Sequence, residues 1–218
     1  MNPYNQFRKN YHSQNGEDGI IEKLFEDLNI TDGYVAEVGA HDGIEISNTY
    51  NIFKNNNSFI PILIEGDLER VERLKNNLKD ISAKYVIERY IDTDKNCLDN
   101  IFESLCLPDL SSRFQLLSID IDGDDYGVWK GLIKYRPKII VIEADSFAPP
   151  HVVKHDIVTG FSVAALDILA MEKNYKLVTH CGNVFFVVAE LFDKLEIEHN
   201  SPRDVFDWSW IRRTPQKY

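Results

Sequence analysis

The densest group of chemically reactive side chains follows the apolar run Leu116–Ile119. Four carboxylates crowd into residues 120–125: Asp120, Asp122, Asp124 and Asp125. So much negative charge at one strand end is costly unless a cationic ligand, a metal ion or protonation of one group relieves it. The spacing lacks the final glutamate and the helical flanks of an EF-hand loop, which argues against calcium binding by that route.

A second candidate is the turn that follows an earlier apolar run, Glu37-Val38-Gly39-Ala40-His41-Asp42-Gly43. Gly39 and Gly43 permit a tight turn and a close approach of a ligand to the backbone. The three-glycine fingerprint that cradles a pyrophosphate, GxGxxG, is missing. The turn therefore favours a cofactor without a pyrophosphate and disfavours a nucleotide-dependent oxidoreductase.

Carboxylates also end the next two strand-like runs. Glu65, in Ile64-Glu65-Gly66-Asp67, could accept hydrogen bonds from the two hydroxyls of a ribose. We assign Glu65 to ligand binding and Asp67 to the N-cap of the following helix, a position that acidic residues favour. Asp92, after Tyr90 and Ile91, could flank an adenine ring, although that run could equally end in an ordinary loop.

Short β-branched runs and amphipathic stretches alternate along the chain and must position these residues. The runs predict strands at Tyr34–Val38, Ile60–Glu65, Tyr85–Ile91, Phe114–Asp120, Lys138–Glu143, Tyr175–Thr179 and Val184–Val188. The intervening stretches predict helices at Ser13–Leu28, Leu68–Leu78, Leu98–Leu105, Tyr126–Ile133 and Phe161–Lys173. This alternation gives parallel strands joined by crossover helices. Because ligands bind beyond the carboxyl ends of such strands, we expect the motifs to share one crevice.

The last two predicted strands are separated only by His180–Asn183, which is too short for a helical crossover and predicts an antiparallel hairpin at one edge. Five or so parallel strands closed by such a hairpin form the α/β, Rossmann-like sandwich of class I methyltransferases, although other doubly wound folds share the pattern. The length of 218 residues predicts a single domain. Residues 1–30 are expected to form an N-terminal helical extension, and residues 190–218 a C-terminal tail.

The composition favours an ordinary folded protein of the cytoplasm. A formal net charge of −11 repels nucleic-acid backbones and anionic lipid surfaces, so we expect neither as a partner. Three cysteines without a CxxC pair favour a reducing compartment. The polar N-terminus does not resemble a signal peptide, and no apolar run approaches the length of a membrane span. We therefore expect a cytoplasmic location without membrane insertion, and leave open whether the chain forms a homo-oligomer.

Several separated segments together resemble one family, the FkbM-like S-adenosylmethionine-dependent methyltransferases. They are Ser13–Gly19, Glu37–Gly43, Ser47–Thr49, Ile64–Gly66, Ser118–Tyr126, Val141–Glu143 and Gly182–Val187. The most specific parts are the leading SQxGED, the later SNT and the IDxDGxDY pattern. One departure is Ile142-Glu143-Ala144-Asp145, where members often read IEYN.

The resemblance implies S-adenosylmethionine as cofactor and O-methylation of a small-molecule or saccharide acceptor, such as a capsule or exopolysaccharide sugar or a macrolide-type, polyketide-like compound. It places residues 37–41 around the methionine moiety, Glu65 on the ribose and Asp120 beside the transferring methyl. With the assignments above, the predicted cofactor-binding residues are Gln14, Glu37, Gly39, Ala40, His41, Ser47, Asn48, Glu65, Gly66, Asp92 and Asp120. Local capping is an equally good interpretation of Ser47 and Asn48.

Methyl transfer from a sulfonium is an in-line displacement that needs an aligned, partly deprotonated acceptor oxygen. The predicted catalytic residues are Asp120, His41, Asp122 and Glu143, and residues 148–159 are expected to cover the acceptor. A divalent metal ion held by Asp120, Asp122 and Asp145 could instead acidify the hydroxyl, an alternative that we do not favour. The alternative function is a binding or scaffold protein that keeps the fold without catalysis.

Overall fold

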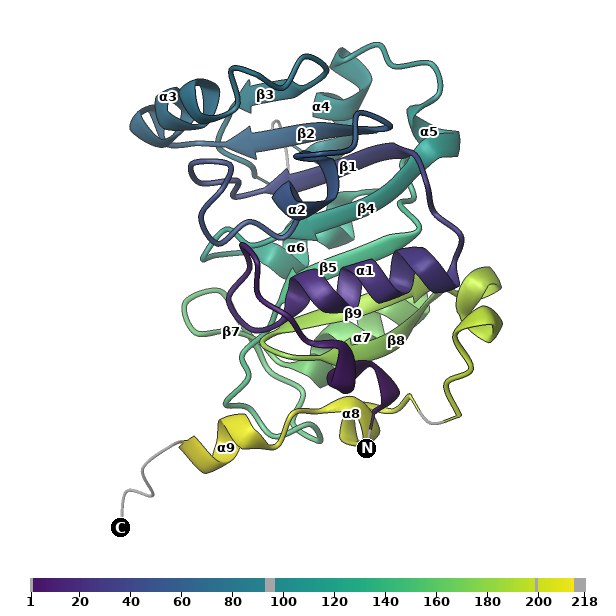
Figure 1. The fold of residues 1–218 in the computed structure, drawn as a ribbon. Helices are drawn as coiled ribbons and strands as arrows, with labels where there is room; N and C mark the ends of the chain where they lie inside the picture. The colour runs from purple at the N-terminus through teal and green to yellow at the C-terminus, as the bar shows by residue number, and fades with distance from the viewer. Residues whose placement is uncertain (1, 93–96, 199, 214–218) are drawn as a thin grey trace.

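The computed structural model describes residues 2–92, 97–198 and 200–213. Its centre is a seven-stranded sheet in the order β3-β2-β1-β4-β5-β9-β8, and a separate two-stranded hairpin pairs β6 with β7 (Figure 1). The strands are β1 (Gly33–Val38), β2 (Phe59–Glu65), β3 (Tyr85–Glu88), β4 (Phe114–Ile119), β5 (Ile139–Glu143), β6 (His155–Asp156), β7 (Gly160–Phe161), β8 (Tyr175–His180) and β9 (Asn183–Val188).

The first five strands of the large sheet are mutually parallel, whereas β9 runs antiparallel to both β5 and β8. Strands β1 and β4, in the middle of the sheet, are buried along their whole length. Burial on both faces explains why these runs are continuously apolar instead of alternating. The arrangement confirms the predicted α/β fold, a mostly parallel sheet with an antiparallel hairpin at one edge.

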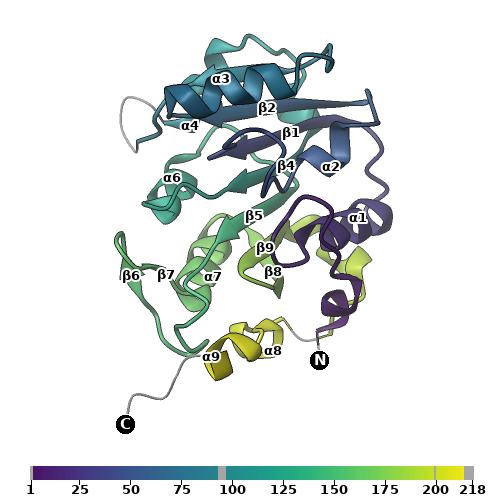
Figure 2. The same ribbon diagram turned by 60° about the vertical axis from the view of Figure 1, so that its left-hand side comes forward.

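The helices cover both faces of the sheet. They are α1 (Glu17–Asp27), α2 (Tyr50–Phe53), α3 (Leu68–Asn77), α4 (Leu98–Ser104), α5 (Leu110–Arg113), α6 (Asp125–Gly131), α7 (Val163–Glu172), α8 (Pro202–Val205) and α9 (Ser209–Arg213), with 3-10 helices η1 (Pro3–Phe7) and η2 (Ala189–Leu195). Helices α1 and α2 lie on one face of the sheet, and α6 and α7 on the other (Figures 1 and 2). Within the described residues, no helix combines the length and the apolar composition that crossing a membrane requires.

Most predicted element ends are correct within two residues, and the exceptions have local causes. Strand β3 ends at Glu88 instead of Ile91, because its only partner in the ladder, β2, ends at Glu65. Helix α1 begins at Glu17 instead of Ser13, because residues 11–13 donate their backbone N–H groups to the Asp18 carboxylate at 2.7–2.8 Å. These residues therefore form a loop ahead of the helix.

The short helices α2 and α5 were not predicted, and two longer regions also contain structure that was not predicted. The segment expected as an acceptor-covering loop carries the β6–β7 hairpin. The expected C-terminal tail carries η2, α8 and α9, and it buries Phe192, Leu195, Val205 and Phe206 in the core. Residues 214–218 of that tail lie outside the described residues.

Candidate active site

A cleft of about 950 Å³ opens at the carboxyl ends of β1, β2, β4 and β5. It brings together nearly all the residues that the sequence analysis singled out: Gln14, Glu37, Gly39, Ala40, His41, Ser47, Asn48, Glu65, Gly66, Asp120, Asp122, Glu143 and Asp145. Asp92 is not among its lining residues and is exposed, whereas its neighbours Tyr90 and Ile91 do line it. The parallel strands place these side chains together because all of them end at the same edge of the sheet.

The Glu65 carboxylate is held from two sides at the end of β2. Its Oε2 accepts the backbone N–H of His41 at 2.9 Å, and its Oε1 accepts the backbone N–H of Asp67 at 2.9 Å. Each carboxylate oxygen can accept more than one hydrogen bond, so both keep acceptor capacity toward the cleft. The Asp67 side chain caps α3 by accepting the Arg70 N–H at 2.9 Å, as predicted.

Gly39 lies where the turn after β1 meets the end of β4. Its φ is +81°, and a Cβ built at this position would lie 1.8 Å from the carbonyl oxygen of Asp120. Any side chain would therefore separate the two strand ends. Close packing of backbone against backbone, in addition to ligand access, requires this glycine.

Glu37 organises the SNT segment beneath the cleft. Its carboxylate accepts hydrogen bonds from the hydroxyls of Ser47 at 2.6 Å and Thr49 at 2.7 Å, and from the Asn48 N–H at 2.7 Å. Asn48 in turn donates its side-chain amide to Ser118 Oγ at 3.0 Å. Complete burial raises the pKa of Glu37, while these hydrogen bonds oppose the shift. The network fixes Ser47 and Asn48 at the wall of the cleft.

The SQxGED segment forms another wall. The Asp18 carboxylate accepts hydrogen bonds from backbone N–H groups of the preceding loop. Glu17 accepts hydrogen bonds from the Asn15 N–H at 2.6 Å and from the Asn183 side-chain amide at 3.1 Å. The Asn183 bond ties the start of α1 to β9, at the antiparallel side of the sheet. Two motifs that are far apart in the sequence therefore meet in one wall.

Three carboxylates converge at the floor of the cleft. Asp120, Asp122 and Glu143 each offer an oxygen, and these three oxygens lie within 4.8 Å of one another. All three residues are exposed to the open cleft, yet the protein atoms around them exclude part of their solvation. This desolvation and the nearby carboxylates raise the pKa of Asp120 to about 8 and that of Glu143 to about 7. A cation in the cleft would stabilise their charged forms.

The remaining acids of this region have other partners. Asp124 caps α6 by accepting the Gly127 N–H at 2.9 Å, and the buried Asp125 accepts the Ile121 N–H at 3.0 Å. Asp145, named as a ligand only in the alternative with a divalent ion, pairs with Lys154 and does not join the group of three. Glu143 takes the place that the sequence analysis gave to Asp145.

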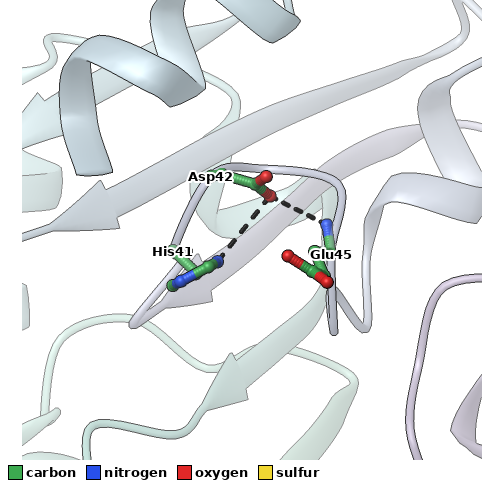
Figure 3. A group of neighbouring side chains, drawn as sticks. All are labelled: His41, Asp42 and Glu45. Atoms are coloured by element: carbon green, nitrogen blue, oxygen red, sulfur yellow. Dashed lines mark hydrogen bonds and ion pairs between the residues drawn. The ribbon is translucent and has the colours of Figure 1, made fainter. Parts of the chain in front are cut away.

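A second mixed group lies on the loop after β1. His41, Asp42 and Glu45 also bring ligand atoms within 4.8 Å of one another (Figure 3). The backbone N–H groups of Ile44 and Glu45 orient Asp42 at 3.0 and 2.8 Å, and the His41 Nδ1 lies 3.8 Å from Asp42 Oδ1. His41 and Glu45 line the cleft, so this loop contributes both backbone and side chains to it.

The cleft also contains residues that sequence reasoning missed. They are Phe147 and Trp210, which both line it. Ile157 and Val158 line it as well, and they belong to residues 148–159, the segment expected to cover the acceptor. Phe147 directly precedes that segment, which was the available signal for it. Trp210 gave no such signal, because its segment was interpreted as a tail.

No family model matches the chain, and no curated protein matches it either. Among solved structures, 142 chains match. The N-terminal domain of EvdMO1, solved in the presence of SAH and D-fucose, is 14% identical, with 82% of this chain and 84% of that chain covered and a TM-score of 0.51. A SAM-dependent methyltransferase from Aquifex aeolicus is 12% identical, with 77% of this chain and 88% of that chain covered and a TM-score of 0.47.

The strand order and the similarity to the EvdMO1 domain define the class of fold: this chain has an α/β, Rossmann-like fold with an antiparallel hairpin at one edge of the sheet. At 14% identity the similarity concerns the fold alone. The resemblance to the FkbM-like family remains a prediction from the sequence motifs.

Proposed function

We propose that this chain is an S-adenosylmethionine-dependent O-methyltransferase that acts on a hydroxyl of a sugar, of the capsule or exopolysaccharide type, or of a polyketide-like small molecule. The observation that carries the proposal is the position of the Asp120–Asp122–Glu143 group. It lies in one cleft between the β1–β2 strand ends, which suit a cofactor, and the loops after β5, which suit an acceptor. Carboxylates with raised pKa values in a cleft are typical of catalytic sites.

The β1–β2 half suits this cofactor. Glu65 presents a preorganised carboxylate to a ribose diol, and the Gly39–Gly43 turn provides close backbone approach without a pyrophosphate cradle. Asp120 lies between this half and the acceptor half, where burial and the neighbouring carboxylates raise its pKa, so that a nearby positive charge would stabilise its ionised form. A sulfonium or an ammonium group next to Asp120 would supply that charge.

Bound S-adenosylmethionine would supply an electrophilic methyl group. Its transfer would join the methyl carbon to the acceptor oxygen and leave S-adenosylhomocysteine, so the chain must supply a base for the hydroxyl proton. We assign this role to Glu143, because a carboxylate with a pKa of about 7 can accept a proton at neutral pH and release it to water afterwards. The negative charge of Asp120 complements the sulfonium and orients the hydroxyl.

A divalent ion held by Asp120, Asp122 and Glu143 is the competing mechanism. Oxygen ligands of this kind suit magnesium or manganese. We favour the metal-free route. Glu143 can accept the hydroxyl proton, and Asp120 can face the cationic cofactor, without an ion between them.

Two measurements test the proposal. Isothermal titration calorimetry with S-adenosylmethionine and S-adenosylhomocysteine should show saturable binding, which Glu65→Ala weakens. Labelled methyl transfer to neutral saccharides and polyketide-like alcohols should then identify an acceptor. Binding without transfer to any acceptor would support the alternative of a scaffold protein, and absence of cofactor binding would refute the proposal.

A further inference from the structure

The C-terminal segment is anchored to the core so that its last described helix reaches the cleft. Phe206 is buried, and its ring stacks on the His180 ring with centroids 4.8 Å apart and planes inclined by 17°. The Asp207 N–H donates to His180 Nδ1 at 3.1 Å, and the Asp207 carboxylate pairs with Arg8 at 2.8 Å. These contacts fix the chain immediately before α9, and α9 carries Trp210.

Trp210 meets Phe147 at the mouth of the cleft. The two rings are edge to face, with centroids 5.8 Å apart and an interplanar angle of 85°. Phe147 is 53% exposed on the loop after β5, and its backbone N–H is fixed by Asp145 Oδ1 at 3.0 Å. Both residues line the cleft. Phe147 is exposed and Trp210 is partly buried, so the pair combines a fixed ring with open apolar surface, as a ligand platform requires.

The β6–β7 hairpin adds further apolar surface to the same half. Its tip residues Ile157 and Val158 are 61% and 91% exposed and line the cleft. At its base, Phe161 stacks on Tyr126 with centroids 5.2 Å apart. The hairpin is therefore anchored at its base, while its apolar tip stays exposed at the cleft, where a ligand could contact it.

Charge in the cleft is distributed unevenly. The floor of the acceptor half is acidic, with Asp120, Asp122 and Glu143. Among the described residues that line the cleft, no lysine occurs, and the arginines Arg70 and Arg89 belong to α3 and to the end of β3, on the Glu65 side. Lys154 lies beside this half, but its ammonium is paired with the Asp145 carboxylate. The acceptor half is therefore negative overall: it offers hydrogen-bond acceptors for hydroxyl groups, and it repels carboxylates and phosphates.

We infer that Phe147 and Trp210 form the wall against which an acceptor ring packs, and that this acceptor is a polyhydroxylated ring without a carboxylate or phosphate beside the methylated hydroxyl. A pyranose has the required two-sided character, because its C–H face suits an aromatic wall and its hydroxyls suit carboxylate acceptors. This inference rests on the proposed function and adds the charge class of the substrate and two specificity-determining residues.

The first experiment compares matched neutral and acidic acceptors. Labelled methyl transfer is measured with the methyl glycosides of galactose, glucose and mannose and with those of galacturonate, glucuronate and mannuronate. We expect transfer to at least one neutral glycoside, with kcat/KM at least about tenfold higher than for its uronate, which corresponds to about 1.4 kcal/mol. Equal or better use of the uronate, or no transfer to any of the six although cofactor binds, would overturn the inference.

The second experiment tests the wall with Trp210→Ala, and Trp208→Ala is its matched control. Trp208 lies two residues away and packs on Phe206 with centroids 5.4 Å apart, but it does not line the cleft. We expect Trp210→Ala to raise KM for the neutral glycoside about tenfold, with kcat and cofactor affinity within about twofold of the parent. Trp208→Ala should leave all three values unchanged.

An unchanged KM in Trp210→Ala, or an equal rise in both variants at equal thermal stability, would overturn the role of the wall. A chain that binds no S-adenosylmethionine in calorimetry would instead refute the proposed function itself. The two failures are therefore distinguishable.

Discussion

The carboxylate of Glu65 accepts the backbone N–H of His41 at 2.9 Å and thereby joins the end of β2 to the turn after β1. His41 itself has a left-handed backbone, with φ of 49°, so the turn is tight at this residue. The chain's own hydrogen bonds therefore hold the β1–β2 side of the cleft, to which we assign the cofactor, in a fixed arrangement. Preorganisation of this kind lowers the ordering cost of binding.

Replacing Glu65 with alanine should weaken S-adenosylmethionine binding. The change removes the acceptor of two ribose hydroxyls, each worth about 1.5–3 kcal/mol when charge-assisted, and it also frees the His41 turn. Calorimetry should show a dissociation constant raised at least about tenfold. Glu69→Ala, an exposed position on α3, is the matched control and should bind normally. An unchanged affinity in Glu65→Ala would place the ribose elsewhere.

Replacing Gly39 with alanine should destabilise the fold and not only the site. The new Cβ would lie 1.8 Å from the Asp120 carbonyl oxygen at a φ of +81°. Strain and overpacking together should lower the free energy of unfolding by about 2–5 kcal/mol, measured by urea denaturation. Gly131→Ala, where a Cβ meets nothing within 4 Å, should leave stability nearly unchanged. Similar stability of the two variants would contradict the close approach of β1 and β4.

Glu143→Gln should lower kcat by about 10²–10⁴-fold, because the amide cannot accept the hydroxyl proton. Cofactor affinity should stay within a few-fold of the parent, because the β1–β2 half is untouched. Glu172→Gln, an exposed position on α7, controls for the loss of one negative charge. A Glu143→Gln variant with full kcat would show that another group is the base.

Chelation should leave turnover intact if the acidic floor acts without a metal. The test is the rate of methyl transfer by metal-stripped protein, with chelator and with added magnesium or manganese. Metal-free turnover is expected because Glu143 can accept the proton itself and Asp120 can complement the sulfonium. Complete dependence on an added ion would instead assign Asp120, Asp122 and Glu143 as its ligands.

Acid should destabilise the protein through His180. This imidazole is fully buried between Ser146 and Asp207, and burial lowers its pKa to about 3. Below pH 6.5 the unfolded chain gains a proton that the folded chain cannot accept until about pH 3, so stability is lost as the pH falls through this window. At pH 5 the loss should reach about 2 kcal/mol relative to pH 7. In His180→Gln, the slope of unfolding free energy against pH between 5 and 6.5 should flatten, and an unchanged slope would exclude His180 as its source.

Local patterns in the sequence determined the strands of the large sheet, the helices α1, α3, α4, α6 and α7, and the location of the cleft. Apolar runs and helical periodicity are properties of neighbouring residues, so the seven strands of the large sheet and the Asp67 cap could be predicted. The short link between β8 and β9 also required these two strands to pair antiparallel, whatever their position in the sheet. Because strands of one direction end at one edge, the motifs at their ends had to meet.

Only the tertiary structure decided which partner each side chain takes. In the run after β4, Asp124 and Asp125 accept hydrogen bonds from local backbone N–H groups. The carboxylates of Asp120 and Asp122 instead lie close to that of Glu143, a residue of another strand. Trp210 reaches the cleft because the segment before it packs on His180. The partner of each side chain depends on packing between segments that are distant in the sequence, and the local periodicity of the sequence does not predict that packing.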